Sequence, residues 1–264
     1  IFSRPLNENH SMKSYDIITL TVNPALDKSA KFSGLIAEQK IRCEAPRYDA
    51  GGGGINVSKA IHRLGGEALT IFTAGGPIGS MLETCLQEEA IPTLVISTKN
   101  WTRENFVAFD THTQSQYRFG FPGAPLSEAE QQQINKVIKN TTAKYLVLSG
   151  SLNESLLADF YQQITKTAAP ETKIVVDTSG EALQKVLESK VYLVKPNVGE
   201  LAKLIGVEKL EMDEVAQAAQ ELIAKGNVEI VVVSLGPHGA ILVTKDQTEI
   251  VTAPNVVRKS TVGA

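Results

Sequence analysis

The stretch AGGGGINVSKAIHRLGG (residues 50–66) decides the fold class, because a glycine run leads directly into a helical repeat of apolar residues. Apolar residues from Val57 to Leu64 recur at the spacing of one helix face, and Gly65 follows as a stop signal. Glycines let the backbone approach a ligand closely, and the N-terminus of a helix attracts anions. We therefore predict a site for an oxygen-rich anionic ligand here; a flexible linker is the alternative interpretation.

Short apolar segments typical of strands buried on both faces lie on either side of this helix. They are residues 16–22, 68–74, 145–148, 173–176, 191–194 and 228–235. A second helical repeat covers residues 215–222, and Ser127 with Glu130 predicts a capping box at the start of a third helix. This alternation predicts an α/β fold with a doubly wound, mainly parallel sheet flanked by helices, whose ligands lie beyond the carboxyl ends of the strands.

Two regions, residues 31–50 and 105–123, interrupt the alternation with short β-type runs that carry polar and aromatic residues. They predict a small antiparallel flap over the ligand-binding edge. A pair of surface hairpins fits the same pattern equally well.

The composition is that of one ordinary globular domain that binds small molecules. The 264 residues include 42% hydrophobic and 21% charged residues, with a net charge of -3, so no basic field favours nucleic acid. Cys43 and Cys85 lack the spacing of a metal site, and no apolar run has the length of about 20 residues that spans a bilayer. We predict a cytoplasmic protein without nucleic-acid or membrane partners. Residues 1–15 are interpreted as a leader or vector-derived segment.

Polar residues follow two of the predicted strands. Asp27 comes after the Asn-Pro turn that ends the first strand, where a carboxylate could bind sugar hydroxyls or simply stabilise the turn. Asn197 and Glu200 follow the strand at 191–194, where they could hold hydrated Mg²⁺ and phosphate oxygens. The alternative for this pair is a helix cap, with Asn as the N-cap and Glu at N3.

The segment from Ser234 to Gly239 leaves two interpretations open. Its glycines could admit a nucleobase or a phosphate, or could form a hairpin into residues 240–244. Neither the P-loop pattern GxxxxGK[ST] nor a GxGxxG after the first strand occurs, which argues against a P-loop nucleotidase and a standard dinucleotide-binding protein.

Nine blocks in order resemble the phosphofructokinase B family of ribokinase-like sugar kinases, and most closely its bacterial 6-phosphofructokinase branch, over about residues 17–264. The blocks are TLTVNPALD (19–27), AGGGGINVSKAIHRLGG (50–66), NWTREN (100–105), YRFGFPGAPL (117–126), LSGSL (148–152), VVDTSGEAL (175–183), LVKPNVGEL (193–201), VVVSLGPHGA (231–240) and STVGA (260–264). The resemblance implies a ribokinase-like domain over residues 16–264, with a β-sheet lid formed by about residues 28–50 and 103–123.

The resemblance also implies an activity. Such kinases transfer the γ-phosphoryl group of ATP, with Mg²⁺, to a sugar hydroxyl. Fructose 6-phosphate, converted to fructose 1,6-bisphosphate in glycolysis, is the favoured substrate, and tagatose 6-phosphate and fructose 1-phosphate are the alternatives. A different class of function is a non-catalytic fragment that binds sugar phosphate without turnover. The family lid further implies a homodimer.

The resemblance assigns the substrate-binding residues one by one. Asp27 would bind sugar hydroxyls, Arg103 would bind the substrate phosphate, and Lys40 would reach that phosphate from the neighbouring subunit, with Arg118 as a further candidate. The glycine run and the residue after its isoleucine would contact the body of the sugar. These last residues are Gly51, Gly52, Gly53 and Asn56.

On the nucleotide side, the resemblance favours a binding role over the capping interpretation for Asn197 and Glu200. The residues implied to bind ATP are Lys195, Asn197, Glu200, Ser234, Gly236 and Gly239. Asp177 and Glu200 are implied to hold Mg²⁺. The family pattern continues after TVGA into the Gly-Asp that supplies the catalytic base, so this residue is expected just after Ala264 and no catalytic residue is named in the chain.

Overall fold

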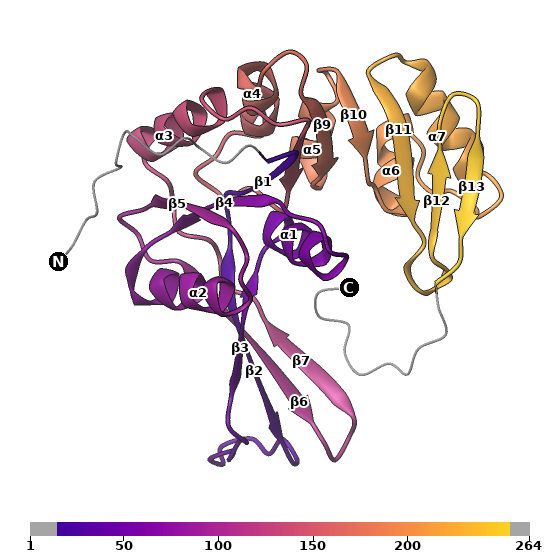
Figure 1. Ribbon diagram of the computed structural model, residues 1–264. Coiled ribbons are helices and arrows are strands. Elements are labelled where there is room, and N and C mark those ends of the chain that lie inside the picture. Colours follow the sequence, from indigo (N-terminus) through magenta and orange to yellow (C-terminus); the bar gives the residue numbers. More distant parts are fainter. Residues whose placement is uncertain (1–14, 254–264) are drawn as a thin grey trace.

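The computed structural model describes residues 15–253, and its centre is a mainly parallel sheet (Figure 1). Within these residues the sheet has nine strands in the order β13-β12-β11-β10-β9-β8-β1-β4-β5. The strands are β1 (Ile17–Thr21), β4 (Leu69–Ala74), β5 (Thr93–Ser97), β8 (Tyr145–Ser149), β9 (Lys173–Asp177), β10 (Val191–Val194), β11 (Val228–Ser234), β12 (Ala240–Val243) and β13 (Thr248–Val251). All pairs are parallel except β11–β12 and β12–β13, so the predicted fold class is confirmed.

Helices cover both faces of this sheet. They are α1 (Gly53–Arg63), α2 (Gly76–Glu88), α3 (Glu128–Lys139), α4 (Phe160–Thr167), α5 (Gly180–Val186), α6 (Val198–Ile205) and α7 (Val215–Ala224). Adjacent residues of β4 identify the two sides, because successive side chains of a strand point to opposite faces. Ile71 belongs to the large hydrophobic cluster that includes α3 to α7, and Phe72 belongs to the smaller cluster of α1 and α2.

A local sequence signal explains where helix α3 begins. The predicted capping box is present in α3, where Ser127 N donates to Glu130 Oε2 at 2.6 Å and Glu130 N donates to Ser127 Oγ at 3.4 Å. This arrangement satisfies N–H groups that the first turn leaves without helical partners.

A second sheet, which we call the lid, projects from the edge of the central sheet (Figure 1). Its strands lie in the order β3-β2-β6-β7 and are β2 (Ala25–Phe32), β3 (Arg47–Gly51), β6 (Arg103–Asp110) and β7 (Ser115–Phe119). The expected antiparallel flap is wrong for its centre, because β2 and β6 pair in parallel from Ala25–Arg103 to Phe32–Asp110. Both strands leave the same edge of the central sheet, after β1 and β5, and therefore run in the same direction.

The flap and the pair of hairpins, which were the two interpretations of the lid region, each describe part of the structure. The β2–β3 and β6–β7 pairs are hairpins, and together they form one sheet that begins at Ala25, three residues earlier than the predicted boundary at 28. Two parts of the prediction lie outside the described residues, namely residues 1–14 of the leader predicted at 1–15 and the STVGA block at 260–264.

Candidate active site

The predicted site residues gather where the parallel strands end. Lys195 follows β10, and Asp177 and Ser234 are the last residues of β9 and β11. Asn23 and Gly150, which were not among the predicted residues, follow β1 and β8. Because β1, β8, β9, β10 and β11 are neighbours in the sheet, these positions form one row along its carboxyl edge. The glycine run and the lid lie beside β1. The site therefore has two sides, one near the lid and one near the ends of β9 to β11.

The glycine run allows α1 to pack directly on the sheet. A Cβ on Gly53 would lie 2.6 Å from the backbone nitrogen of Gly150, and one on Gly54 would lie 2.9 Å from the carbonyl oxygen of Leu20. A Cβ on Gly51 would overlap the carboxylate of Asp27, 2.8 Å from its Cγ. Sequence reasoning attributed these glycines to ligand approach, and the structure adds a second cause, which is close contact within the protein itself.

The N-terminus of α1 is held against β1 by one side chain. The N-cap residue Gly52 has a φ of 133°, in a region that favours glycine, and it offers no side-chain cap. Thr21 Oγ1 accepts a hydrogen bond from Ile55 N at 3.1 Å. The positive end of the helix therefore lies at the carboxyl edge of the sheet.

Asp27 lies on the face of the lid that turns toward α1. Its Oδ1 accepts a hydrogen bond from Asn105 Nδ2 at 2.8 Å, across the β2–β6 pair. Partial burial raises the pKa of the Asp27 carboxyl above its usual value, against the opposing effects of this hydrogen bond and of Arg103 and Lys59. A desolvated carboxylate with one fixed partner is suited to accept hydrogen bonds from hydroxyl groups.

Arg103 is held by backbone carbonyls and keeps one unpaired donor. Its Nη1 donates to Phe121 O at 3.0 Å and its Nη2 donates to Asn23 O at 3.3 Å. Its Nε is buried and has no hydrogen-bond partner. Burial lowers the pKa of the guanidinium, partly offset by Asp27. A buried donor without a partner is costly, and an anion such as a phosphate oxygen would satisfy it.

A cavity of about 440 Å³ separates the lid from α1. Asn56, Lys59 and Arg63, which share one face of α1, line one side. Asp27 and Asp49, paired across β2 and β3, line the opposite side. The predicted residues Asp27 and Asn56 thus face one cavity from different elements.

Two predicted substrate residues lie farther from this cluster. Lys40 belongs to the exposed connection between β2 and β3, beyond the far end of β2 at Phe32. Phe32 lies five positions after Asp27 on β2, which corresponds to about 17 Å of strand. Arg118 lies on β7 opposite Val107, so it is exposed on the same lid face as Asp27 but nearer the tip.

On the other side of the site, Asp177 and Lys195 form an ion pair. Lys195 Nζ lies 3.0 Å from Asp177 Oδ1, and Ser149 Oγ donates to Asp177 Oδ2 at 3.3 Å. Both side chains of the pair are partly exposed, so a ligand can reach them. Ser149 also lies against Gly53, and it therefore connects the glycine run with this ion pair.

The capping interpretation of Asn197 and Glu200, which the resemblance had placed second, describes the structure. Asn197 Oδ1 accepts from Glu200 N at 2.9 Å, and Glu200 Oε2 accepts from Asn197 N at 2.9 Å. Asn197 is the N-cap of α6, whose local sequence fully explains this pairing. Asn197 is exposed, and a nucleotide or metal role for the pair stays a prediction.

The hairpin interpretation of the segment at 234–239 also describes the structure. Ser234 pairs with Ala240 across antiparallel β11 and β12, with a 3₁₀ turn (Gly236–His238) between them. A Cβ on Gly239 would overlap the carbonyl of Val251, and Gly236, where a Cβ would meet open space, has a φ of 60° that favours glycine. The role of this turn in nucleotide binding stays a prediction.

No preformed metal cluster is present in the part of the chain that the structure describes, because no three His, Cys, Asp or Glu side chains are grouped to hold an ion. Mg²⁺ can instead bind through one or two carboxylates, waters and substrate phosphates. The helices within residues 15–253 are also all too short or too polar to cross a membrane.

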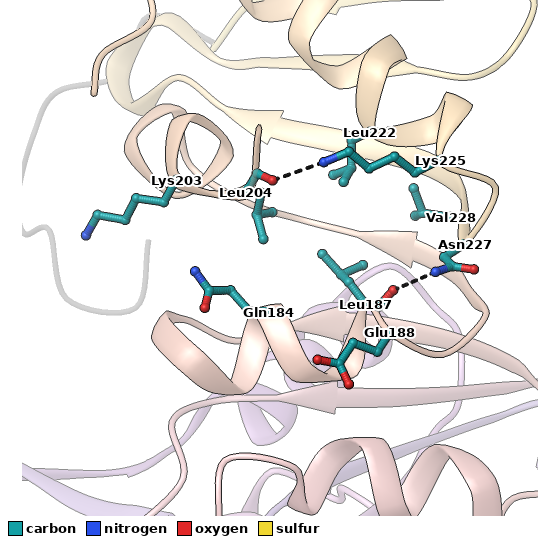
Figure 2. Close-up of a pocket in the computed structure, with 9 residues that line it drawn as sticks. All are labelled: Gln184, Leu187, Glu188, Lys203, Leu204, Leu222, Lys225, Asn227 and Val228. Atoms are coloured by element: carbon teal, nitrogen blue, oxygen red, sulfur yellow. Dashed lines mark hydrogen bonds between the residues drawn. The ribbon is translucent and has the colours of Figure 1, made fainter. Parts of the chain in front are cut away.

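A separate cavity of about 270 Å³ lies between α5, α6 and α7, near the start of β11 (Figure 2). Lys225 Nζ donates to Leu204 O at 3.3 Å and Asn227 Nδ2 donates to Leu187 O at 3.1 Å. These bonds satisfy carbonyl groups at the ends of helices, which is a structural role. The predicted site residues do not line this cavity.

A sequence profile described as pfkB family carbohydrate kinase matches residues 12–264. The chain belongs to this family. The pfkB kinase described here is 42% identical over 251 residues to the ATP-dependent 6-phosphofructokinase isozyme 2 of Mycobacterium tuberculosis, covering 94% of this chain and 74% of the relative. Identity to the isozyme 2 of Escherichia coli is 41%, covering 94% and 81%.

Solved structures of pfkB kinases agree with the fold. The phosphofructokinase-2 of Escherichia coli in complex with fructose-6-phosphate superposes with a TM-score of 0.88 at 39% identity, covering 93% of this chain and 82% of that one. A tetrameric inhibited form of the same enzyme also matches, with a TM-score of 0.88 at 40% identity over 94% of this chain and 83% of that one.

Sequence reasoning about this pfkB kinase missed Asn105, Ser149 and Lys59. Asn105 is two residues after Arg103 on the same strand, so alternation alone places both side chains on one lid face. Ser149 directly follows the predicted buried strand at 145–148 and is the last residue of β8, and this position after a buried strand was a usable signal. Nothing in the helical repeat distinguishes Lys59, whose burial depends on the lid.

Proposed function

We propose that this pfkB kinase transfers the γ-phosphoryl group of ATP to fructose 6-phosphate and forms fructose 1,6-bisphosphate. The observation that carries the proposal is the proximity of Arg103 to Asp27, which lines the cavity between the lid and α1. Burial raises the pKa of the Asp27 carboxyl, and the charge of Arg103 opposes this rise. A carboxylate for hydroxyl groups and a buried guanidinium nitrogen without a partner match the two ends of a sugar phosphate.

The chemistry of each residue supports this assignment. Asp27, fixed by Asn105, would accept hydrogen bonds from the sugar hydroxyls, and Asn56 would bind them from the opposite side of the cavity. Arg103 would bind the phosphate of the substrate. The positive end of α1 lies beside these residues, where it would stabilise developing negative charge.

The comparisons favour fructose 6-phosphate among the ketohexose phosphates. Identity is 42% and 41% to two 6-phosphofructokinases, against 29% to a 1-phosphofructokinase of Borreliella burgdorferi and 28% to a tagatose-6-phosphate kinase of Staphylococcus epidermidis. The second candidate function is therefore one of these other sugar-phosphate kinase activities, with the same site and a different preference.

ATP would occupy the other side of the row of strand ends. Lys195 would pair with its phosphates, and the turn with Ser234, Gly236 and Gly239 would contact the nucleotide. Mg²⁺ would neutralise charge on the phosphates, and Asp177 and Glu200 are the carboxylates whose chemistry suits its hydrated form. To bind the ion, Asp177 would have to change its ion pair with Lys195, and Glu200 would have to change its capping contact with Asn197.

The lid supports a proposal about assembly. We propose that it pairs with the lid of a second copy, so that Lys40 at its distant end reaches the phosphate in the neighbouring site. The separation of Lys40 from Asp27 along β2 supports a role in another subunit. A cytoplasmic location also stays a prediction.

A coupled assay of ADP release by the full-length protein tests the proposed function. We expect the largest kcat/KM for fructose 6-phosphate, and smaller values for tagatose 6-phosphate and fructose 1-phosphate. Absence of turnover with all three sugar phosphates would overturn the proposal. Calorimetric binding of fructose 6-phosphate without turnover would instead favour the non-catalytic binding function.

A further inference from the structure

A lysine inside the wall of the cavity connects the lid to the body of the protein. Lys59 lies on α1, and its side chain is only 7% exposed. Its Nζ lies 2.6 Å from Glu89 Oε1, at the end of α2, and 3.6 Å from Asp49 Oδ1, on lid strand β3. A buried ammonium is stable only with such partners, so Lys59 fixes both carboxylates and is fixed by them.

The lid partner of Lys59 is directly coupled to Asp27. Asp49 on β3 is the register partner of Asp27 on β2, and both line the cavity. Movement of β3 relative to α1 therefore moves Asp27 relative to Asn56, which lies one turn before Lys59 on the same helix face. The position of Asp49 sets the geometry of the residues that face the sugar.

The other cation near Asp49 cannot perform this role. Arg47 Nε lies 3.0 Å from Asp49 Oδ2, but its side chain is 77% exposed and it belongs to the same strand as Asp49. An exposed ion pair is worth little, and a contact within one strand does not constrain the angle between lid and body. Lys59 is buried and connects the lid to the body of the protein, so it can fix the angle between them.

We infer that Lys59 is a positioning residue, which holds the lid at the distance from α1 where Asp27 and Asn56 both contact the sugar phosphate. The inference rests on the proposed function for the identity of the substrate. It assigns to Lys59 a role in sugar-phosphate affinity, which follows from its contacts with Asp49 and Glu89 and not from contact with the substrate.

The test compares Lys59→Met with Lys59→Arg in the full-length protein. A misplacement of about 1 Å at a reacting group costs about 100-fold, so we expect Lys59→Met to raise the KM for fructose 6-phosphate at least about tenfold. The KM for ATP should change less than about twofold, because ATP is proposed to bind near β9 to β11. Lys59→Arg retains the charge and should restore most of the affinity.

A second measurement needs no turnover. Amide hydrogen exchange of β2 and β3 should be faster in Lys59→Met than in the wild type, and unchanged in the control Lys209→Met, which breaks an exposed Lys209–Glu211 pair of 2.6 Å far from the lid. Combining Lys59→Met with Asp49→Asn should add little to the KM change, because both substitutions break one connection.

Two results would overturn the inference. One is unchanged fructose 6-phosphate KM and unchanged lid exchange in Lys59→Met. The other is an equal loss for both substrates, not restored by Lys59→Arg, which would mean that Lys59 only stabilises the fold. If the wild type phosphorylates none of the three sugar phosphates, the proposed function fails, while the exchange experiment still decides whether Lys59 holds the lid.

Discussion

Replacing Gly51 by Ala should displace the carboxylate of Asp27 while leaving the fold nearly intact. The new Cβ would lie 2.8 Å from Asp27 Cγ, and Cβ atoms essentially never approach another heavy atom within 3.0 Å. Gly51 has no positive φ, so alanine can adopt its backbone conformation. Because the obstructed atoms belong to the end of a side chain, the carboxyl can withdraw and abandon its 2.8 Å bond from Asn105.

The size of the effect follows from the interaction that Asp27 would lose. A hydrogen bond to a charged group is worth about 1.5–3 kcal/mol, which corresponds to a loss of about 10- to 150-fold in kcat/KM. Stability should fall by only about 1 kcal/mol, the lower end for overpacking. Gly53→Ala should instead cost about 3 kcal/mol, because its Cβ would meet the backbone nitrogen of Gly150 at 2.6 Å.

The assay is the coupled measurement of ADP release, with thermal unfolding of each variant as the measure of stability. Gly120→Ala is the matched control, because its Cβ would meet Asn105 Oδ1 at an ordinary 3.9 Å and should change neither quantity. A Gly51→Ala enzyme with kcat/KM for fructose 6-phosphate within twofold of the wild type would refute the reasoning. An equal increase in the KM for ATP would refute it as well.

Three further predictions follow from the site. Arg103→Ala should raise the KM for fructose 6-phosphate by about 10- to 150-fold and leave the KM for ATP nearly unchanged in the same steady-state assay; equal changes would show that Arg103 has another role. Lys195→Met removes the cation 3.0 Å from Asp177 and should raise the KM for ATP at least about tenfold, whereas an effect on the sugar phosphate alone would contradict the assignment. Asp27→Asn should abolish most activity and yet stabilise the protein at pH 7. The folded pKa of Asp27 lies above the usual 3.8, so the folded state binds more protons, and the wild type loses stability as pH rises through that interval. The advantage of the variant in urea unfolding should therefore disappear below pH 3.8, and an advantage that grows toward acid would be inconsistent with this cause.

The central sheet could be predicted from the sequence because each of its strands has a local sequence pattern. Continuous apolar runs such as residues 145–148 and 191–194 are typical of strands covered on both faces, and the helical repeats between them require a parallel sheet. The capping box at Ser127 is equally local, since it involves residues three apart.

The lid illustrates what periodicity does not reveal. Its central pairing joins β2 to β6, and nothing in either strand indicates the partner or the direction of pairing. The direction depends on where each strand leaves the central sheet. For the same reason the burial of Lys59 could not be predicted, since the side chain is covered by elements that come together only in the folded protein.

The roles of the site residues stay predictions, and the structure adds which of these residues lie close together. Asp27 and Arg103 come from segments that periodicity does not connect, and the structure places them side by side, where the charge of each shifts the pKa of the other. Asn197 and Glu200 have a complete structural explanation as a cap, so their geometry neither requires nor excludes a bound nucleotide.

The parallel pairing of β2 with β6 also determines the order in which the chain can fold. Asp27 and Asn105 are 78 residues apart, so at a synthesis rate of about 5–20 residues per second strand β2 exists for about 4 to 16 seconds before the matching part of β6 emerges from the ribosome. During this interval β2 presents an unpaired edge, which is a template for association with other chains. The lid that is proposed to enclose the substrate is therefore also a segment that is exposed to aggregation in the nascent chain.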